Sequence, residues 1–185
     1  MKHYRSVTRG TSVPFIRGEE ATRPEHPMNK QFFIFTDGSA IGNPGPAGWA
    51  AIVLHGTKRQ EIAGSVPWST VSEMELRAAV EALRLTPTGA RIELRSDSEL
   101  LIDGMRFLVF RWQRFGWRNS RGFDLQHQEL WRELILLSAQ RTIRWRWIRG
   151  HSGHPIQSRA DALAYLCVVS RESSARFWGV HGHRL

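Results

Sequence analysis

The chain of 185 residues has little of what membrane and secreted proteins need. No run approaches the roughly 18 apolar residues of a membrane span, so we expect no membrane association. Residues 1–30 contain no apolar stretch of the kind found in secretory signals, which predicts a cytoplasmic protein. An organellar presequence is the alternative, because the segment up to Arg17 is basic and free of acids, although Glu19 and Glu20 then weaken it.

Cysteine and lysine are also scarce. The single cysteine, Cys167, excludes an internal disulfide, and its setting in LAYLCVV indicates a buried, unreactive thiol. Of the 26 basic residues only three are lysines, so nearly all the positive charge is arginine, whose planar group suits phosphate and stacks on aromatic rings. Eight tryptophans accompany a net charge of +9, which indicates a nucleic-acid surface. An arginine-rich genome would give the same composition.

Periodicity and turn residues divide the chain into an N-terminal arm (1–30), one domain (31–170) and a C-terminal tail (171–185). The arm lacks a periodic apolar pattern and is predicted to be flexible, and Met28 is an alternative start. Strands are predicted at 31–37, 48–56, 59–67, 90–97 and 142–150, and helices at 72–85, 98–110, 123–139 and 156–170. This order predicts an α/β fold, a mixed sheet with helices on its faces.

Acidic side chains stand at the ends of these predicted elements. Asp37 ends the first strand and Asp97 the fourth, so both would meet at one sheet edge if those strands are neighbours. Asp161 lies near the start of the last helix, and Glu75 in the first turn of the helix at 72–85. Helical periodicity does not distinguish Glu75 from Glu73. Each acid alone also has an ordinary explanation as a cap or a solvated surface charge.

Four motifs decide between these readings. TDGSAIGNPGPAGWAA (36–51), EMELRAAVEAL (73–83), LRSDSELL (94–101) and GHSGHPIQSRADALA (150–164) occur in an order and at separations that resemble type 1 ribonuclease H. The resemblance runs from about Phe33 to Tyr165. It implies a ribonuclease H-like fold, with three antiparallel strands followed by two parallel ones and helices on both faces. It also implies hydrolysis of the RNA strand of RNA–DNA hybrids with little sequence specificity, giving 5′-phosphate and 3′-hydroxyl ends.

The resemblance assigns the acids to catalysis and metal binding. It selects Glu75, the glutamate of M-E-L, and makes Asp37, Glu75, Asp97 and Asp161 the ligands of two Mg²⁺ ions, with Mn²⁺ as a substitute. Two ions about 4 Å apart activate the attacking water and stabilise charge on the leaving oxygen, and carboxylates are the hard ligands they prefer.

Histidines form part of the same resemblance. The first histidine of GHSGHP, His151, occupies the place of the family's flexible catalytic histidine, and imidazole is a side chain suited to proton transfer. His154 is interpreted as structural. A zinc pair is the alternative reading of the two, but the sequence has no second pair at ligand spacing.

A basic, aromatic segment, RWQRFGWRNSRG (111–122), falls where many family members carry a protrusion that grips the DNA strand. The alternative for its tryptophans is simple packing. The resemblance also implies that Asn43 lies near the RNA, that Thr70 lies in a DNA phosphate pocket, and that the loop beside Asp37 approaches the substrate. The predicted substrate-binding residues are Gly38, Ser39, Asn43, Thr70, Ser72, Trp112, Arg114, Trp117 and Arg118.

Two departures from the family pattern stand out. Val71-Ser72-Glu73 replaces two asparagines and a variable residue before M-E-L, so grip on the RNA 2′-hydroxyls is open to change. Gln157-Ser158 replaces asparagine and glutamate before Asp161, which bears on the loop around His151. A silent hybrid-binding module and a DNA strand-transfer enzyme are the rival readings, and the complete set of acids favours an active enzyme. We expect a monomer without an obligate protein partner.

Overall fold

The computed structural model describes residues 31–180, with side chains up to Arg171. Predictions about the arm, its start and the last five positions lie outside the described residues. The elements in chain order are β1 Phe32–Ala40, β2 Gly45–His55, β3 Lys58–Ser69, α1 Val71–Arg84, β4 Arg91–Ser96, α2 Glu99–Asp103, the π-helix η2 Gly104–Leu108, α3 Val109–Arg114, α4 Gln128–Ala139, β5 Thr142–Trp147 and α5 Pro155–Val180.

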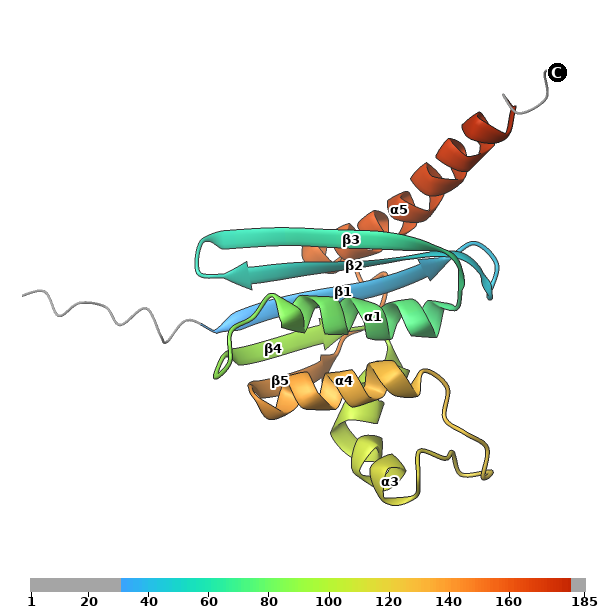
Figure 1. The fold of residues 1–185 in the computed structure, drawn as a ribbon. Coiled ribbons are helices and arrows are strands. Elements are labelled where there is room, and N and C mark those ends of the chain that lie inside the picture. The colour runs from blue at the N-terminus through green and yellow to red at the C-terminus, as the bar shows by residue number, and fades with distance from the viewer. Residues whose placement is uncertain (1–30, 181–185) are drawn as a thin grey trace, which may run out of the picture.

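One five-stranded sheet organises the domain, with strand order β3-β2-β1-β4-β5. β1 pairs with β2 and β2 with β3 in antiparallel fashion, whereas β1 pairs with β4 and β4 with β5 in parallel. The predicted α/β fold with a mixed sheet, three antiparallel strands followed by two parallel ones, is confirmed (Figure 1).

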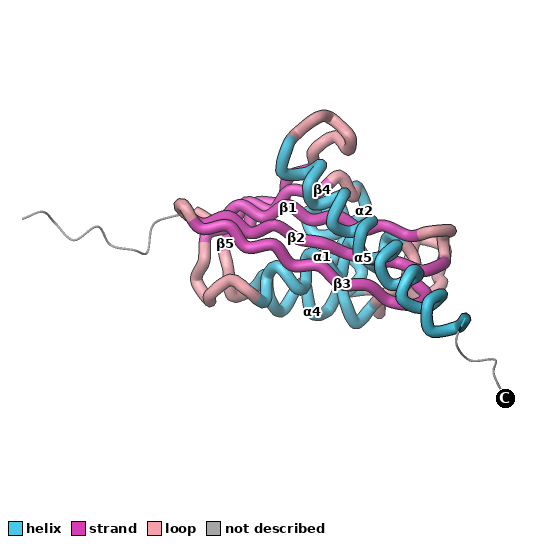
Figure 2. The backbone as a smooth tube through the Cα atoms, turned by 90° about the horizontal axis from the view of Figure 1, so that it is seen from above, coloured by secondary structure: helices cyan, strands magenta, loops and turns pink. Residues whose placement is uncertain are grey.

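Helices cover the two faces of the sheet unequally. α1 packs on β1 and β2, and α4 packs on α1 and β5, whereas α5 packs on β1, β2 and β3 (Figures 1 and 2). The larger core cluster lies on the side of α1 and α4 and includes Ile34, Leu83, Leu94 and Trp131. A smaller cluster around Phe35 fills the α5 side. β1 is apolar on both faces because both are covered.

The structure corrects three predicted helix boundaries. The helix expected at 98–110 is divided into α2, η2 and α3 and continues to Arg114. The helix expected at 123–139 begins only at Gln128, so the prediction is wrong for 123–127: His127 adopts a left-handed conformation at φ 56°, which stops the helix there. The helix predicted to end near Ser170 continues to Val180, since no Pro or Gly interrupts the chain from Ile156 to Trp178.

No helix in the range 31–180 is long and apolar enough to cross a membrane.

Gly104 lets the π-helical turn η2 approach α4. A β-carbon at this position would overlap the ring of Trp131, which is fully buried. We therefore expect Gly104→Ala to lower the free energy of unfolding by about 1–3 kcal/mol, the usual cost of overpacking a core. The smaller ring of Trp131→Phe should relieve the overlap, so the alanine should cost less in that background. Denaturant unfolding of both single variants and the double variant measures the coupling, and additive effects would contradict this account.

Candidate active site

The parallel pairing of β1 with β4 brings Asp37 and Asp97 to the same edge of the sheet. Phe35 lies opposite Arg95, so two residues further on Asp37 is level with Asp97. Asp37 is buried within β1, and its Oδ1 accepts a hydrogen bond of 2.7 Å from the backbone N–H of Gly38. The two carboxylates therefore share one site, as expected for neighbouring strands of an α/β sheet.

A glycine allows α1 to start against β1. A β-carbon on Gly38 would lie 2.6 Å from the backbone nitrogen of Glu75, so no larger residue fits without displacing the helix. The Oε2 atom of Glu75 accepts a hydrogen bond of 2.5 Å from Ser98, which follows β4. Glu73 instead accepts a 2.7 Å bond from Ser69. The structure thus separates the two glutamates that periodicity left equivalent and places Glu75 beside the aspartates.

The β5–α5 connection supplies the remaining predicted groups. Asp161 lies in the second turn of α5, and its Oδ2 is 3.6 Å from Nδ1 of His151. The His151 side chain is 85% exposed, on a backbone with φ 50°. Asp37, Asp97, His151 and Asp161 line one small pocket. The structure therefore brings all five predicted catalytic residues to one edge, with Glu75 joined through Ser98. His154 packs against the ring of Phe35, in line with a structural role.

Gln157 lies at the centre of this pocket, although the sequence marked it only as a departure from a pattern. It is 3% exposed, and its Nε2 lies 3.1 Å from Asp37 Oδ2, 3.4 Å from Asp97 Oδ1 and 3.2 Å from the Thr36 carbonyl oxygen, donating to all three. Its Oε1 is buried without a hydrogen-bond partner. The available signal was its position one helical turn before Asp161, on the same helix face.

Burial and mutual repulsion raise the pKa values of three acids in the site. Burial, followed by the charges of Asp97 and Asp161, raises the pKa of Asp37 to about 8, against a lowering hydrogen bond from Gly38. Burial raises the pKa of Glu75 to about 6, opposed by the bond from Ser98. The pKa of Asp97 is raised as well, again mainly by burial. Ionisation of all these carboxyl groups at the sheet edge is therefore unfavourable, which favours binding of a proton or a cation.

These residues suit a divalent cation by chemistry. Carboxylate oxygens are the hard ligands that Mg²⁺ and Mn²⁺ prefer. The raised pKa values reflect burial first and neighbouring negative charge second, and a bound cation would offset both. Within residues 31–171, no three His, Cys, Asp or Glu side chains are yet placed around one ion position. Gln157 occupies the space between Asp37 and Asp97, and Ser98 holds Glu75. The donor set fits, and the Gln157 amide would have to move from between Asp37 and Asp97 for an ion to bind there.

The predicted backbone-binding residues cluster at the start of α1. The Oγ1 atom of Thr70 caps the helix by accepting from the N–H of Glu73 at 3.2 Å, and it lies 3.5 Å from Nε2 of His127. Asn43 accepts from the N–H of Val71 at 3.2 Å. Ser72 lines a pocket that His127 shares. His127 is a residue that the sequence reasoning missed, because nothing before α4 marked it. Ser39, half-buried in β1, follows Gly38.

The tryptophans of the basic segment pack instead of facing the substrate. Trp112 and Trp117 are each 7% exposed and belong to the main core cluster. The ring of Trp112 meets that of Trp131 edge to face, and Arg132 lies over the ring of Trp117. The prediction that Trp112 and Trp117 bind the substrate is therefore wrong, and the structure agrees with the alternative of simple packing, because both rings are buried in the core.

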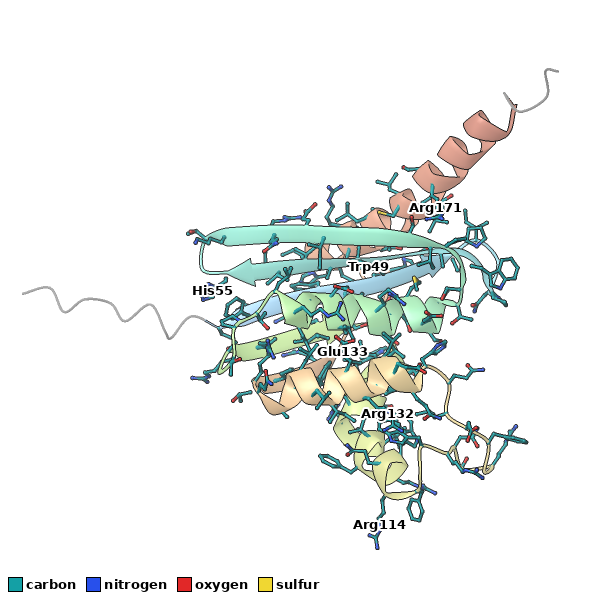
Figure 3. All side chains as sticks on the ribbon, viewed as in Figure 1. Trp49, His55, Arg114, Arg132, Glu133 and Arg171 are labelled. Atoms are coloured by element: carbon teal, nitrogen blue, oxygen red, sulfur yellow. The ribbon has the colours of Figure 1, made fainter. Side chains whose placement is uncertain are left out.

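Two arginines of the same segment remain open to solvent. Arg114 projects away from the sheet at the end of α3 (Figure 3), and Arg118 is 61% exposed and 3.7 Å from Asp124. Their exposure leaves both accessible to a phosphate backbone, and their contact with substrate stays a prediction.

The raised pKa of Asp37 makes stability of the metal-free protein depend on pH. A carboxyl whose pKa rises from 3.8 to about 8 on folding stabilises the fold when protonated, and this stability is lost between about pH 4 and pH 8. Glu75 contributes only up to about pH 6. In EDTA, Tm should therefore fall from pH 6 to pH 8, and Asp37→Asn should fall less, ending at least about 2–4 °C higher at pH 8. Glu61→Gln is the control, because arginine contacts lower the pKa of that exposed acid, so its contribution is constant over this range. If Tm of Asp37→Asn fell with pH as steeply as Tm of the wild type, the assignment to Asp37 would be refuted.

The amide of Gln157 should stabilise the site when no ion is bound. Gln157→Leu replaces the amide with a branched apolar side chain and removes the N–H that bridges Asp37 and Asp97. We expect a loss of about 1.5–3 kcal/mol at pH 8 in EDTA, the usual worth of hydrogen bonds to charged groups. Ser158→Ala, at the exposed neighbouring position, should change little. Equal unfolding free energies of wild type and the leucine variant would show that the bridge is unimportant.

Comparison with known proteins identifies the family. The family model of RNase H matches residues 29–168. Ribonuclease HI of Caulobacter vibrioides is 40% identical over 137 residues, covering 74% of this chain and 92% of the relative. Ribonuclease H of Pelobacter propionicus is 45% identical over 136 residues, covering 74% and 83%.

Solved structures agree with these relatives. LC9-RNase H1, described as a type 1 RNase H with the type 2 active-site motif, superposes with a TM-score of 0.69 at 28% identity, covering 76% of this chain and 73% of that one. LC11-RNase H1, solved in complex with an RNA/DNA hybrid, has a TM-score of 0.59 at 21% identity, covering 76% and 99%, and shows the shared fold. The chain is therefore an enzyme of the ribonuclease H family.

Proposed function

We propose that this enzyme hydrolyses the RNA strand of RNA–DNA hybrids with two Mg²⁺ ions, for which Mn²⁺ substitutes, leaving 5′-phosphate and 3′-hydroxyl ends with little sequence specificity. The observation that carries the proposal is the convergence of Asp37, Glu75, Asp97 and Asp161 from separate elements on one sheet edge. Relatives that are 37–45% identical carry the name ribonuclease H or ribonuclease HI, which denotes an enzyme acting on the RNA of such hybrids. An RNA/DNA hybrid is also the ligand of LC11-RNase H1.

Asp37, Glu75, Asp97 and Asp161 would hold the ions, and the bound ions would supply activation of the attacking water and neutralisation of charge on the leaving 3′ oxygen. The chain itself provides a rigid support for these ligands. Asp37 sits within the central strand of the sheet, and the backbone of Gly38 fixes one of its oxygens. Ser98 fixes Glu75. Ligands held on a strand and a helix lose little freedom on binding, which favours the geometry that phosphodiester hydrolysis needs.

His151 is the proposed proton donor to the leaving oxygen. Its ring is mostly solvent-exposed and stands 3.6 Å from Asp161, so it can approach a substrate without leaving the site. Its loop position allows it to move between the protein and the solvent, and imidazole changes charge near neutral pH.

The start of α1 is the proposed contact for the nucleic-acid backbone. Asn43, Thr70 and Ser72 gather there, and the positive end of the helix dipole favours phosphate. Val71 brings no hydrogen-bonding side chain, so the backbone and its neighbours have to read the hybrid through its shape and 2′-hydroxyls. Arg114 and Arg118 would extend this contact from the basic segment.

A gel assay on labelled substrates tests the proposal. The wild type in Mg²⁺ should cut only the RNA strand of an RNA–DNA hybrid, and neither double-stranded RNA nor double-stranded DNA, and EDTA should abolish cutting. Glu75→Gln should lower the rate by more than the roughly 10–100-fold caused by losing a hydrogen-bonding partner of a metal ligand. Glu81→Gln, the same change on the far turn of α1 where Glu81 pairs with Arg84, should cut at the wild-type rate.

Three outcomes would count against the proposal. Hybrid binding without cutting in both Mg²⁺ and Mn²⁺ would identify a binding module. Cutting of double-stranded DNA would show that discrimination is lost, with Val71 and Ser72 as the first positions to examine. Equal rates for Glu75→Gln and Glu81→Gln would remove Glu75 from the site.

A further inference from the structure

The face of the sheet that carries α5 has an uncovered half. α5 packs on β1, β2 and β3, and in the described part of the chain no helix makes comparable contact with β4 or β5 on this side (Figures 1 and 2). The register fixes which residues point there: Glu93 pairs with Arg144, and Arg95 with Arg146, whereas Ile92, Leu94 and Trp145 face the opposite core.

Arginines dominate this uncovered surface, and we call Arg91, Arg95, Arg144 and Arg146 together the arginine face. Arg91, Arg144 and Arg146 are exposed, and Arg95 is half-buried. The acid on the same surface is Glu93, which is only 5% exposed. Four positive charges therefore stand against one buried negative charge on two adjacent strands.

Glu93 organises the arginines without neutralising them. Arg95 makes a close ion pair of 2.6 Å with its carboxylate and lies over the rings of Phe33 and Phe35. Arg144 and Arg146 stand further off, at 4.0 and 3.8 Å, with 72% and 51% of their side chains exposed. Because both guanidinium groups are exposed and stand at these longer distances from the carboxylate, solvent weakens the two pairs and leaves both groups available to an anion.

The arginine face starts at the catalytic edge. Arg95 precedes Asp97 by two residues, and Arg146 precedes His151 by five. These two arginines are therefore nearest the carboxylates, and Arg144 and Arg91 lie further from them along β5 and β4. Successive side chains on one face of a strand are about 6.6 Å apart, which is comparable to the spacing of phosphates along an extended nucleic-acid strand. Arginine is also the side chain that best matches phosphate geometry.

We propose that the arginine face binds the phosphate backbone of a single-stranded segment that continues beyond the hybrid held at the carboxylates. This inference rests on the proposed hybrid substrate, and it makes the arginine face a second contact that selects hybrids with a single-stranded extension over blunt ones. The backbone of such a segment would reach Arg95 and Arg146 first and then Arg144 and Arg91.

Binding of labelled hybrids in EDTA tests the proposal without any turnover. A blunt hybrid is compared with four hybrids that each carry one single-stranded extension, on the 5′ or 3′ end of the RNA or DNA strand. We expect at least one extension to tighten wild-type binding by about fivefold or more at low salt. The double variant Arg144→Gln/Arg146→Gln should lose this gain and reduce the salt slope by about 1–2, since each lost phosphate contact contributes about 0.7.

Two controls separate this effect from misfolding and from loss of general positive charge. The glutamine variant leaves the close Arg95–Glu93 pair intact, so it should bind and cut a blunt hybrid like the wild type. Lys58→Gln/Arg59→Gln removes the same charge at the β2–β3 hairpin, at the other end of the sheet, and should keep the extension effect. If the wild type did not cut a blunt hybrid in Mg²⁺, the proposed function itself would be rejected.

Three results would overturn the proposal. The first is a wild type that binds all four extended hybrids no more tightly than the blunt one, and this comparison needs no variant. The second is an extension effect that survives in Arg144→Gln/Arg146→Gln or is equally lost in the hairpin variant. The third is a wild type that shows no extension effect but binds poly-glutamate, with this binding lost in Arg144→Gln/Arg146→Gln. That result would assign the arginine face to an acidic protein.

Discussion

The parallel contact between β1 and β4 is the constraint on which the rest of the site depends. Two parallel neighbours cannot be joined by a tight turn, so the chain between them must form a long crossover, here β2, β3 and α1. That crossover returns α1 to the edge where β1 and β4 end and delivers Glu75 beside Asp37 and Asp97. The carboxylates meet because the sheet is wound in this way, and Gly38 removes the one side chain that would keep α1 at a distance.

Gathering carboxylates in this way costs stability, and the structure shows how the cost is met without an ion. The Gln157 amide donates to two of the acids, Ser98 donates to Glu75, and the Gly38 backbone donates to Asp37. These hydrogen bonds offset part of the repulsion and leave the pKa of Asp37 high. The same crowding that weakens the metal-free fold gives the site its affinity for positive charge, so function and local instability have one physical origin.

Much of this arrangement could be predicted from the sequence, for physical reasons that also explain the failures. The first and fourth strands were readable because buried parallel strands are continuously apolar. Their ends were less exact, since β1 continues three residues past Asp37 to Ala40 and β4 ends at Ser96, one residue before Asp97. Trp112 and Trp117 were misread because an aromatic beside arginines has the same pattern whether it packs inward or faces a ligand. The start of α4 depended on the left-handed backbone of His127, which no local composition encodes. Gln157 was missed because its partners are distant in sequence: Asp37 is 120 residues away and Asp97 is 60 residues away.

The length of α5 has a mechanical consequence. One continuous helix carries Asp161 in its second turn, crosses the antiparallel half of the sheet and projects beyond it to Val180 (Figure 1). At about 1.5 Å per residue, its 26 residues form a rod of roughly 39 Å. A rod of this kind transmits rotation and translation along its axis, so a load applied at its far end, such as a fused domain or a surface tether, acts on the position of Asp161.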